Sequence, residues 1–187
     1  MSLTVLALLA AGGGARFDGP THKLRAPFRS ATVVEHSLAA ALDSHLGPVA
    51  IVWGAVGLAD LCPASVTMLH NPDWSHGQAT SIQMAVAWAT ALDATSLVIG
   101  LGDQPGRTAD CWRAVAAATA GPIVGCGDRT LFTPPVRLDR EVWGLLPKGG
   151  DEGARALVRD HPTLVHTVIC NGQPDDVDTV EDLSQWT

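Results

Sequence analysis

Short apolar runs alternate with amphipathic stretches along most of the chain. The first run, Thr4 to Leu9, is apolar on both faces and ends in glycines, which is typical of a buried strand. Further strands are predicted at Val49 to Trp53, Ser65 to Leu69, Ser96 to Leu101, Ile123 to Cys126, Val136 to Leu138 and Leu164 to Ile169. Most of them lack a polar face, so both faces are expected to be covered.

Helices are predicted where apolar residues recur at helical spacing. From Val34 to Leu46 an apolar residue falls at every fourth position, which places one apolar stripe on a helix that Gly47-Pro48 ends. Further helices are expected at Ile82 to Leu92, Trp112 to Ala116, Arg140 to Leu146, Glu152 to Asp160 and Val180 to Trp186.

Strands that alternate with helices and are apolar on both faces predict an α/β fold, with a mainly parallel, mixed sheet between helices. The length of 187 residues suits one compact domain, so residues 1–187 are expected to form a single domain. Such sheets bind ligands beyond the carboxyl ends of their strands. A binding site is therefore expected in the loops after Leu9, Leu101 and Ile169.

Composition and charge narrow the class of ligand. Hydrophobic residues make up 47% of the chain and charged residues 17%, which is typical of a globular core and excludes disorder. The net charge is -7 and Lys and Arg form no cluster, so a nucleic-acid partner is not indicated. A few well-placed cations can still hold the phosphates of a small substrate.

The four cysteines, Cys62, Cys111, Cys126 and Cys170, form no CxxC pair and have no histidine at zinc-finger spacing. They are expected to be reduced and mostly buried, as in a cytosolic protein. The apolar N-terminus resembles a signal-peptide core, but no positive residue precedes it and glycines stand where a cleavage site would be expected. It is far shorter than the ~20 apolar residues of a membrane helix, so a cytoplasmic location without membrane contact is expected.

A glycine-rich loop follows the first strand. It reads Ala10-Ala11-Gly12-Gly13-Gly14-Ala15-Arg16, with Lys23 farther along the chain. Glycines after a strand let backbone N–H groups turn inward and form a cradle for phosphate oxygens. Arg16 can bind an oxyanion through two hydrogen bonds, and Lys23 adds a compact positive charge. The loop matches neither a P-loop nor a complete dinucleotide-binding motif, and a flexible turn with two solvated cations stays open.

Carboxylates follow two other strands. Asp103, in Gly102-Asp103-Gln104-Pro105, comes directly after the strand that ends at Leu101, and Asp178 precedes the last helix. A carboxylate at a strand end beside a phosphate cradle can hold Mg²⁺ through hard oxygen ligands. The alternative is that both residues only cap helices or form turns, although Asp178 can do both.

The segment from His70 to Ser81 leads into a predicted helix. Gly77 and Ser81 at a helix start expose donors that can contact a base, ribose or phosphate. An Asn71-Pro72 turn with ordinary capping is the alternative explanation. The chain has no HxxxH pair, no GxSxG motif and no organised Ser/His/Asp set, so neither a zinc site nor a hydrolase is indicated.

Taken in order, these segments resemble the NTP-transferase family that contains the molybdenum cofactor nucleotidyltransferases. The loop through Arg16 and Lys23 is similar to the family signature, and Gly102-Asp103-Gln104-Pro105 is similar to its metal-binding strand end. The other segments with counterparts are His70 to Ser81, which resembles the cytidylyltransferase branch, Gly150 to Arg155, and the closing motif at Asp176 to Leu183.

The resemblance implies a three-layer αβα, Rossmann-like enzyme that transfers CMP from CTP to the molybdopterin-molybdenum cofactor and releases pyrophosphate. It implies that Asp103 and Asp178 hold Mg²⁺, and that Lys23, Arg16 and Asp103 are catalytic. A recipient molybdoenzyme would be a further partner. The implied nucleotide-binding residues are Ala10, Ala11, Gly12, Gly13, Gly14, Arg16, Lys23, Gly77, Ser81 and Gly102.

Two departures from the family pattern concern the edges of the site. The stretch from Arg16 to Lys23 is longer than the pattern, and Thr133-Pro134-Pro135-Val136 stands where a Gly-His-Pro or Gly-Asn-Pro turn is expected. Two other functions stay open. One is transfer, from CTP or GTP, to another phosphorylated small molecule such as a sugar phosphate, a polyol phosphate or phospholactate. The other is a non-catalytic carrier of a pterin cofactor.

Overall fold

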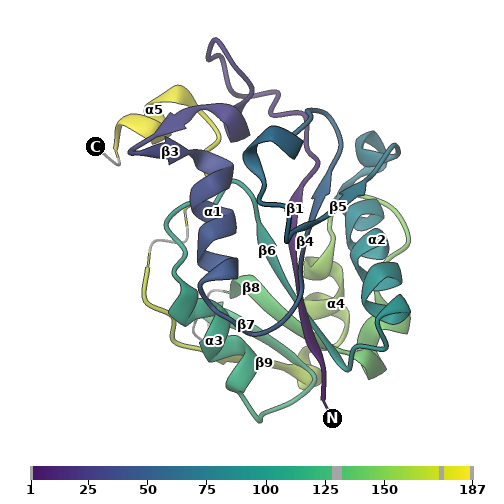
Figure 1. Ribbon diagram of the computed structural model, residues 1–187. Coiled ribbons are helices and arrows are strands. Elements are labelled where there is room, and N and C mark those ends of the chain that lie inside the picture. Colours follow the sequence, from purple (N-terminus) through teal and green to yellow (C-terminus); the bar gives the residue numbers. More distant parts are fainter. Residues whose placement is uncertain (1, 128–131, 173–174, 186–187) are drawn as a thin grey trace.

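A seven-stranded sheet runs through the centre of the protein in the computed structural model, which describes residues 2–127, 132–172 and 175–185 (Figure 1). The strands are β1 (Thr4–Ala10), β4 (Val49–Trp53), β5 (Thr67–His70), β6 (Ser96–Leu101), β7 (Ile123–Gly127), β8 (Phe132–Asp139) and β9 (Val165–Val168). Their order is β5-β4-β1-β6-β8-β7-β9. β8 is antiparallel to both of its neighbours, and every other pairing in this sheet is parallel.

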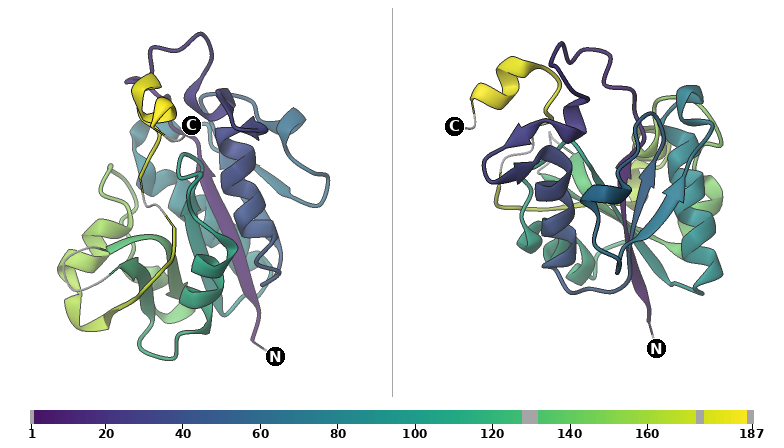
Figure 2. Two further views of the ribbon diagram at one scale, coloured as in Figure 1. Left: turned by 90° about the vertical axis from the view of Figure 1, so that its left-hand side faces the viewer. Right: turned by 45° about the horizontal axis from the view of Figure 1, so that its top comes forward.

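Helices cover both faces of the sheet. α1 (Val33–Leu42) and α3 (Ala109–Ala117) pack on one face, and α2 (Gln78–Ala91) and α4 (Ala154–Asp160) pack on the other, as Figures 1 and 2 show from different sides. The side chains of β1 alternate between these layers: Leu6 and Leu8 contact the α1–α3 side, and Val5 and Ala7 the α2 side. β1 is therefore the buried centre of the molecule.

A small hairpin, β2 (Pro27–Phe28) and β3 (Ala31–Thr32), lies beside the last helix, α5 (Val180–Ser184), at one end of the molecule (Figures 1 and 2). Phe28 and Val177 are buried together there, and Leu183 packs against them. This contact brings the end of the chain to the loops that follow β1 and β6. Short 3-10 helices span Lys23–Arg25, Ala59–Leu61, Trp74–His76, Arg140–Leu145 and Pro162–Leu164.

The predicted α/β class and the mainly parallel, mixed sheet are confirmed, but several helix limits were wrong. α1 ends at Leu42, because the chain turns at Asp43 and His45 takes a left-handed conformation with φ of 53°. The helix expected from Glu152 begins only after Gly153, whose φ is 52°. Arg140–Leu145 forms a 3-10 helix, and Trp186, the predicted end of the last helix, lies outside the described residues. Within the described ranges no helix combines the length and apolarity needed to cross a membrane.

The prediction that all four cysteines are reduced was wrong for Cys126 and Cys170, which form a disulfide. Cys126 lies near the end of β7 and Cys170 just beyond β9, and these parallel neighbours bring the two Cα atoms to 5.4 Å. Their sequence separation of 44 hides this proximity from an analysis of cysteine spacing. Cys62 and Cys111 are free thiols.

Gly100 in β6 lies against the ring of Trp112, which is buried in α3. A Cβ at Gly100 would lie 2.6 Å from Cη2 of that ring, and a close-packed core leaves the ring little room to shift. Gly100→Ala is therefore expected to lower the free energy of unfolding by ~1–3 kcal/mol, the usual cost of overpacking, in urea denaturation. Gly57→Ala is the control, because nothing lies within 4 Å of a Cβ there. Equal midpoints for the two variants would contradict the packing argument.

Candidate functional site

Backbone hydrogen bonds join the end of β1 to the loop that follows β6, and that loop to the one that follows β9. Gly102 donates its N–H to the carbonyl oxygen of Leu9 at 2.8 Å. Val177, which is fully buried, donates its N–H to the carbonyl oxygen of Asp103 at 2.8 Å. These are the loops at which the sequence predicted a site, and the bonds bring together Asp103 and Asp178 from distant parts of the chain.

Four charged side chains meet where these loops join. Nζ of Lys23 lies 2.6 Å from Oδ2 of Asp103 and 3.0 Å from Oδ1 of Asp178, and Nη2 of Arg16 lies 2.7 Å from Oδ2 of Asp178. The side chain of Lys23 is 11% exposed and that of Arg16 is 77% exposed. Burial acts to lower the pKa of Lys23, but the two carboxylates outweigh it and raise the pKa above its ordinary value. The ammonium is therefore held charged inside the cluster.

A cavity of about 460 Å³ opens beside this cluster. Its lining contains most of the residues that the sequence analysis selected, namely Ala10, Ala11, Gly12, Gly13, Gly14, Arg16, Lys23, Gly77, Ser81 and Asp103. The two remaining selected residues act differently. Gly102 ties two strand ends together, and Asp178 contacts Lys23 and Arg16.

The glycines of the first loop have separate structural roles. A Cβ at Gly12 would meet nothing within 4 Å, so the backbone there is open to a ligand. A Cβ at Gly13 would lie 3.1 Å from the ring of Trp74, which packs against the loop. Gly14 has a φ of 63°, a conformation that favours glycine. The loop is therefore accessible to a ligand at Gly12, while the ring of Trp74 packs against it at Gly13.

His22, which the sequence analysis did not select, fixes the turn between the glycine loop and Lys23. Its Nε2 lies 3.0 Å from the carbonyl oxygen of Gly12, and its Nδ1 accepts the N–H of Leu24 at 3.3 Å. Both bonds fit a neutral ring with its proton on Nε2. Burial lowers the pKa of His22; the Gly12 carbonyl acts to raise it, and the charge of Lys23 adds to the lowering. These contacts show how the long stretch before Lys23 still brings its ammonium to the carboxylates.

Asn71 organises another part of the cavity wall and is only 2% exposed. Its Nδ2 donates to Oγ1 of Thr80 and to Oγ of Ser81, both at 2.9 Å. Its Oδ1 accepts the N–H of Asp73 at 3.0 Å. Asn71 therefore holds Ser81, a residue selected from the sequence, in a fixed position.

Gly77 joins this wall to the segment around Gly150. Gly77 has a φ of 105°, and a Cβ there would collide with the backbone carbonyl of Gly150. On either side of this contact, Ala79 donates its N–H to Gly150 at 3.0 Å and Gly150 donates its N–H to His76 at 3.2 Å. The start of α2 and the loop before α4 therefore form one hydrogen-bonded unit.

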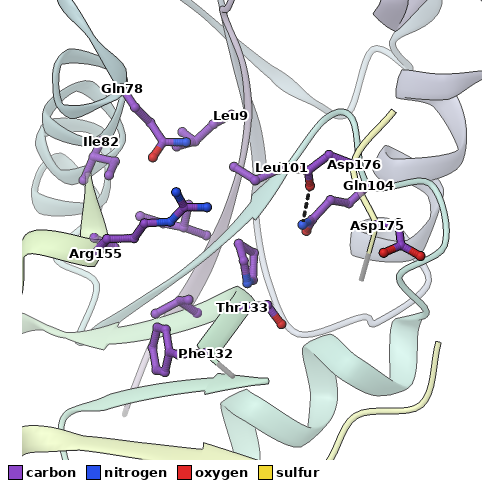
Figure 3. Close-up of a pocket in the computed structure, with 14 residues that line it drawn as sticks. Leu9, Gln78, Ile82, Leu101, Gln104, Phe132, Thr133, Arg155, Asp175 and Asp176 are labelled. Carbon is purple, nitrogen blue, oxygen red and sulfur yellow. Dashed lines mark hydrogen bonds between the residues drawn. The ribbon is translucent and has the colours of Figure 1, made fainter. Parts of the chain in front are cut away.

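A second cavity, of about 370 Å³, adjoins the first. Three residues line both cavities: Leu9, Gln78 and Leu101. Figure 3 shows Arg155 extending into the second cavity from one side and Gln104 with Asp176 from the other. Nε2 of Gln104 donates to Oδ1 of Asp176 at 2.7 Å. Burial raises the pKa of Asp176 and the charge of Asp103 adds to this effect, while the Gln104 hydrogen bond opposes it.

Sequence reasoning quoted Gln104, Arg155 and Asp176 within motifs but gave them no role. The signal that could have found Gln104 and Asp176 is their place beside Asp103 and Asp178 in loops already expected to meet. Arg155 carried no such signal, because its approach to the cavity depends on how α4 packs on the sheet.

Comparison with known proteins agrees with this geometry. Residues 6–166 match the MobA-like NTP transferase domain. The chain is similar to nicotine blue oxidoreductase of Paenarthrobacter nicotinovorans, with 32% identity over 94% of this chain and 92% of that protein. It superposes on a nucleotidyl transferase from Methanothermobacter thermautotroptrophicus with a TM-score of 0.83 and 17% identity, covering 99% of this chain and 96% of that one.

A third relative is Rv0371c of Mycobacterium tuberculosis H37Rv, whose structure was solved as a complex with manganese. Its TM-score is 0.74 at 24% identity, with 99% of this chain and 98% of that chain covered. The fold is thus that of the Rossmann-like nucleotidyltransferases. Within that class, the chain belongs to the MobA-like NTP transferase domain family.

The lowered pKa of His22 predicts a loss of stability in mild acid. The contribution of neutral His22 is complete above the ordinary pKa of 6.5 and is lost as the pH falls from there through the lowered folded-state value. Between about pH 7.5 and about pH 5, the urea midpoint of the wild type should therefore fall further than that of His22→Ala. His76→Ala, which removes an exposed histidine, should keep the wild-type dependence. An identical fall in wild type and His22→Ala would refute the role of His22.

Proposed function

We propose that this protein is a Mg²⁺-dependent molybdenum cofactor cytidylyltransferase, which transfers CMP from CTP to the molybdopterin-molybdenum cofactor and releases pyrophosphate. The observation that carries the proposal is the position of Lys23 between Asp103 and Asp178, beside a cavity lined by the glycine loop. Nucleotidyl transfer requires cations for the phosphates, carboxylates for a metal ion and donors for oxyanions. This cluster supplies all three.

The carboxylates of Asp103 and Asp178 fit a divalent metal ion. The ammonium of Lys23 already contacts both within 3.0 Å, so the two carboxylates face a common point that accepts a cation. Carboxylate oxygens are the hard ligands that Mg²⁺ takes. When bound, the metal supplies positive charge for the phosphate oxygens. The manganese in the Rv0371c complex belongs to that protein and supports the same kind of ion here.

The roles of this chain's residues follow from their positions. The backbone of the glycine loop, open at Gly12, binds the triphosphate. Lys23 exchanges its carboxylate partners for the α-phosphate, which its flexible stem permits. Arg16, which is largely exposed, offsets charge on the departing pyrophosphate. The acceptor phosphate is already anionic, so the reaction needs positioning and charge neutralisation rather than a general base.

The second cavity suits the acceptor. Its apolar wall, which includes Ile82 and Phe132, can lie against a flat heterocycle, and Gln104 and Asp176 can bond to the polar edge of that ring. Arg155 reaches into the same cavity and can bind a phosphate through two parallel hydrogen bonds. A phosphorylated pterin has these features. The cavity adjoins the nucleotide side, so acceptor and α-phosphate would meet near Leu9 and Leu101.

Other acceptors and a non-catalytic carrier role are the competing hypotheses. The Paenarthrobacter relative is named as an oxidoreductase and not as a transferase. Proteins similar to this chain are therefore named for more than one kind of reaction. Pyrophosphate release that requires molybdopterin supports the proposal. Release with a sugar phosphate or polyol phosphate instead would change the acceptor, and pterin binding without release would leave the carrier hypothesis.

Asp103→Asn keeps the shape of the side chain and removes the negative charge that would oppose the metal. Turnover, measured as pyrophosphate release, is expected to fall at least ~10²-fold, the scale of losing one preorganised electrostatic contact. Asp110→Asn is the control, because Asp110 is exposed and pairs only with Arg113 among the described residues. Near-normal turnover of a folded Asp103→Asn variant would exclude Asp103 as a metal ligand.

Base choice is expected to favour CTP. Ala11 is buried in the cavity lining together with Gly77 and Ser81. We expect these residues to wall the base closely enough to admit a pyrimidine and exclude a purine. A mismatched base would also leave buried polar groups unpaired. CTP should exceed GTP by at least ~10-fold in kcat/KM, roughly 1.4 kcal/mol, with molybdopterin as acceptor. Ala11→Gly, which removes a methyl group, should narrow the gap. Equal rates with CTP and GTP, or a preference for GTP, in the wild type would contradict the assignment as a cytidylyltransferase. The broader assignment as a nucleotidyltransferase would not be affected.

A further inference from the structure

Three cysteine sulfurs meet on the α1–α3 side of the sheet. Cys111 comes from α3, Cys126 from β7 and Cys170 from the segment after β9, and their Sγ atoms all lie within 4.8 Å of one another. Cys126 and Cys170 form a disulfide, and Cys111 is a free cysteine whose sulfur lies beside that bond without being part of it.

A buried cysteine often serves only as a small apolar side chain. Cys111 is fully buried, but it is not in a purely apolar setting. Its thiol donates to the carbonyl oxygen of Asn171 at 2.7 Å, and Oγ1 of Thr108 lies 3.4 Å from its sulfur. Since Asn171 follows Cys170, this bond holds the third sulfur against the disulfide.

Arg107 provides a second, independent observation. Its side chain is nearly buried, and its Nε finds no hydrogen-bond partner in the described part of the chain, while one Nη donates to Thr133. The guanidinium also interacts electrostatically with the side chain of Cys111. A buried guanidinium beside the sulfur of Cys111 supplies positive charge of the kind that favours a thiolate.

We propose that Cys111, Cys126 and Cys170, once the disulfide is reduced, form a three-thiolate binding site for Zn²⁺. The site is separate from the nucleotidyl-transfer site, and its failure would leave the proposed function untouched. Tetrahedral zinc with Zn–S bonds of about 2.3 Å places its sulfurs roughly 3.8 Å apart, which small side-chain rotations from the present positions can reach. A fourth position remains for water, and the partial exposure of Cys170 provides an entry path.

The chemistry of the site balances with a dithiol as reductant. The dithiol passes two electrons and two protons to the bond between Cys126 and Cys170, giving two thiols, and is itself oxidised to a disulfide. Zinc then displaces the protons of all three thiols. Three thiolates and one divalent ion leave a single negative charge, which the guanidinium of Arg107 offsets. The disulfide and the zinc complex are therefore mutually exclusive, and both connect β7 to the segment that leads to Asp178.

Zinc titration of the full chain tests the site. The protein is reduced with dithiothreitol, freed of the reductant without oxygen, and titrated with Zn²⁺ against a chromogenic chelator. Wild type and Cys62→Ala, the control that removes the other free cysteine, should each bind one zinc per chain with equal affinity. Cys111→Ala should bind at least ~100-fold more weakly, since loss of even an outer-shell partner of a metal ligand costs 10–100-fold. Absence of binding to the reduced wild type, or wild-type affinity in Cys111→Ala, would overturn the proposal.

A measurement on the unmodified sequence keeps the test decisive if Cys111→Ala does not fold. Co²⁺ added to the reduced wild type should produce the absorption of thiolate-to-cobalt charge transfer, and Zn²⁺ should abolish it. The same protein with its disulfide intact should give no such band. A band of equal strength in both redox states, or in neither, would exclude a thiolate site built from these three residues.

Discussion

The ionic contacts of Lys23 with Asp103 and Asp178 are the interaction on which the rest of the site depends. Two carboxylates held close together repel each other and lose part of their hydration, and a shared ammonium offsets both effects. The backbone makes the arrangement possible, because the buried Val177 donates its N–H to the carbonyl oxygen of Asp103. This bond fixes the position of the backbone at the next residue, Asp178. Removing one charge from such a cluster leaves the others uncompensated, so the three loops are energetically linked.

The sheet order explains why two cavities adjoin at this edge. β6 lies between β1 and β8, and β8 runs antiparallel to β6. The start of β8, at Phe132 to Pro134, therefore lies at the same edge as the ends of the two parallel strands. A fully parallel sheet would have placed the other end of β8 there. The antiparallel strand thus supplies one wall of the cavity that we assign to the acceptor.

The sequence predicted the parallel strands of the main sheet and the loops after them, because a buried parallel strand must be apolar on both faces and ligands meet such sheets at their carboxyl ends. It found only Val136 to Leu138 of the antiparallel β8 and neither strand of the β2–β3 hairpin. It could not predict contacts set by side chains across loops. The ring of His22 contacts the carbonyl oxygen of Gly12 across a turn. The pattern of apolar residues carries no information about the conformation of that turn. The bond between Cys126 and Cys170 depends on the pairing of β7 with β9, which follows from the completed sheet rather than from spacing.

The tight contact between Gly77 and Gly150 has a consequence for how such proteins diverge. Gly77 begins the helix whose first turn lines the nucleotide cavity, and the loop of Gly150 continues toward Arg155 in the neighbouring cavity. A side chain at Gly77 would collide with the backbone of Gly150, so a shift of one backbone is expected to displace the other. A mutation that changes the shape of one pocket is therefore expected to change the shape of its neighbour as well. The preferences for the two substrates are then expected to evolve together rather than one at a time.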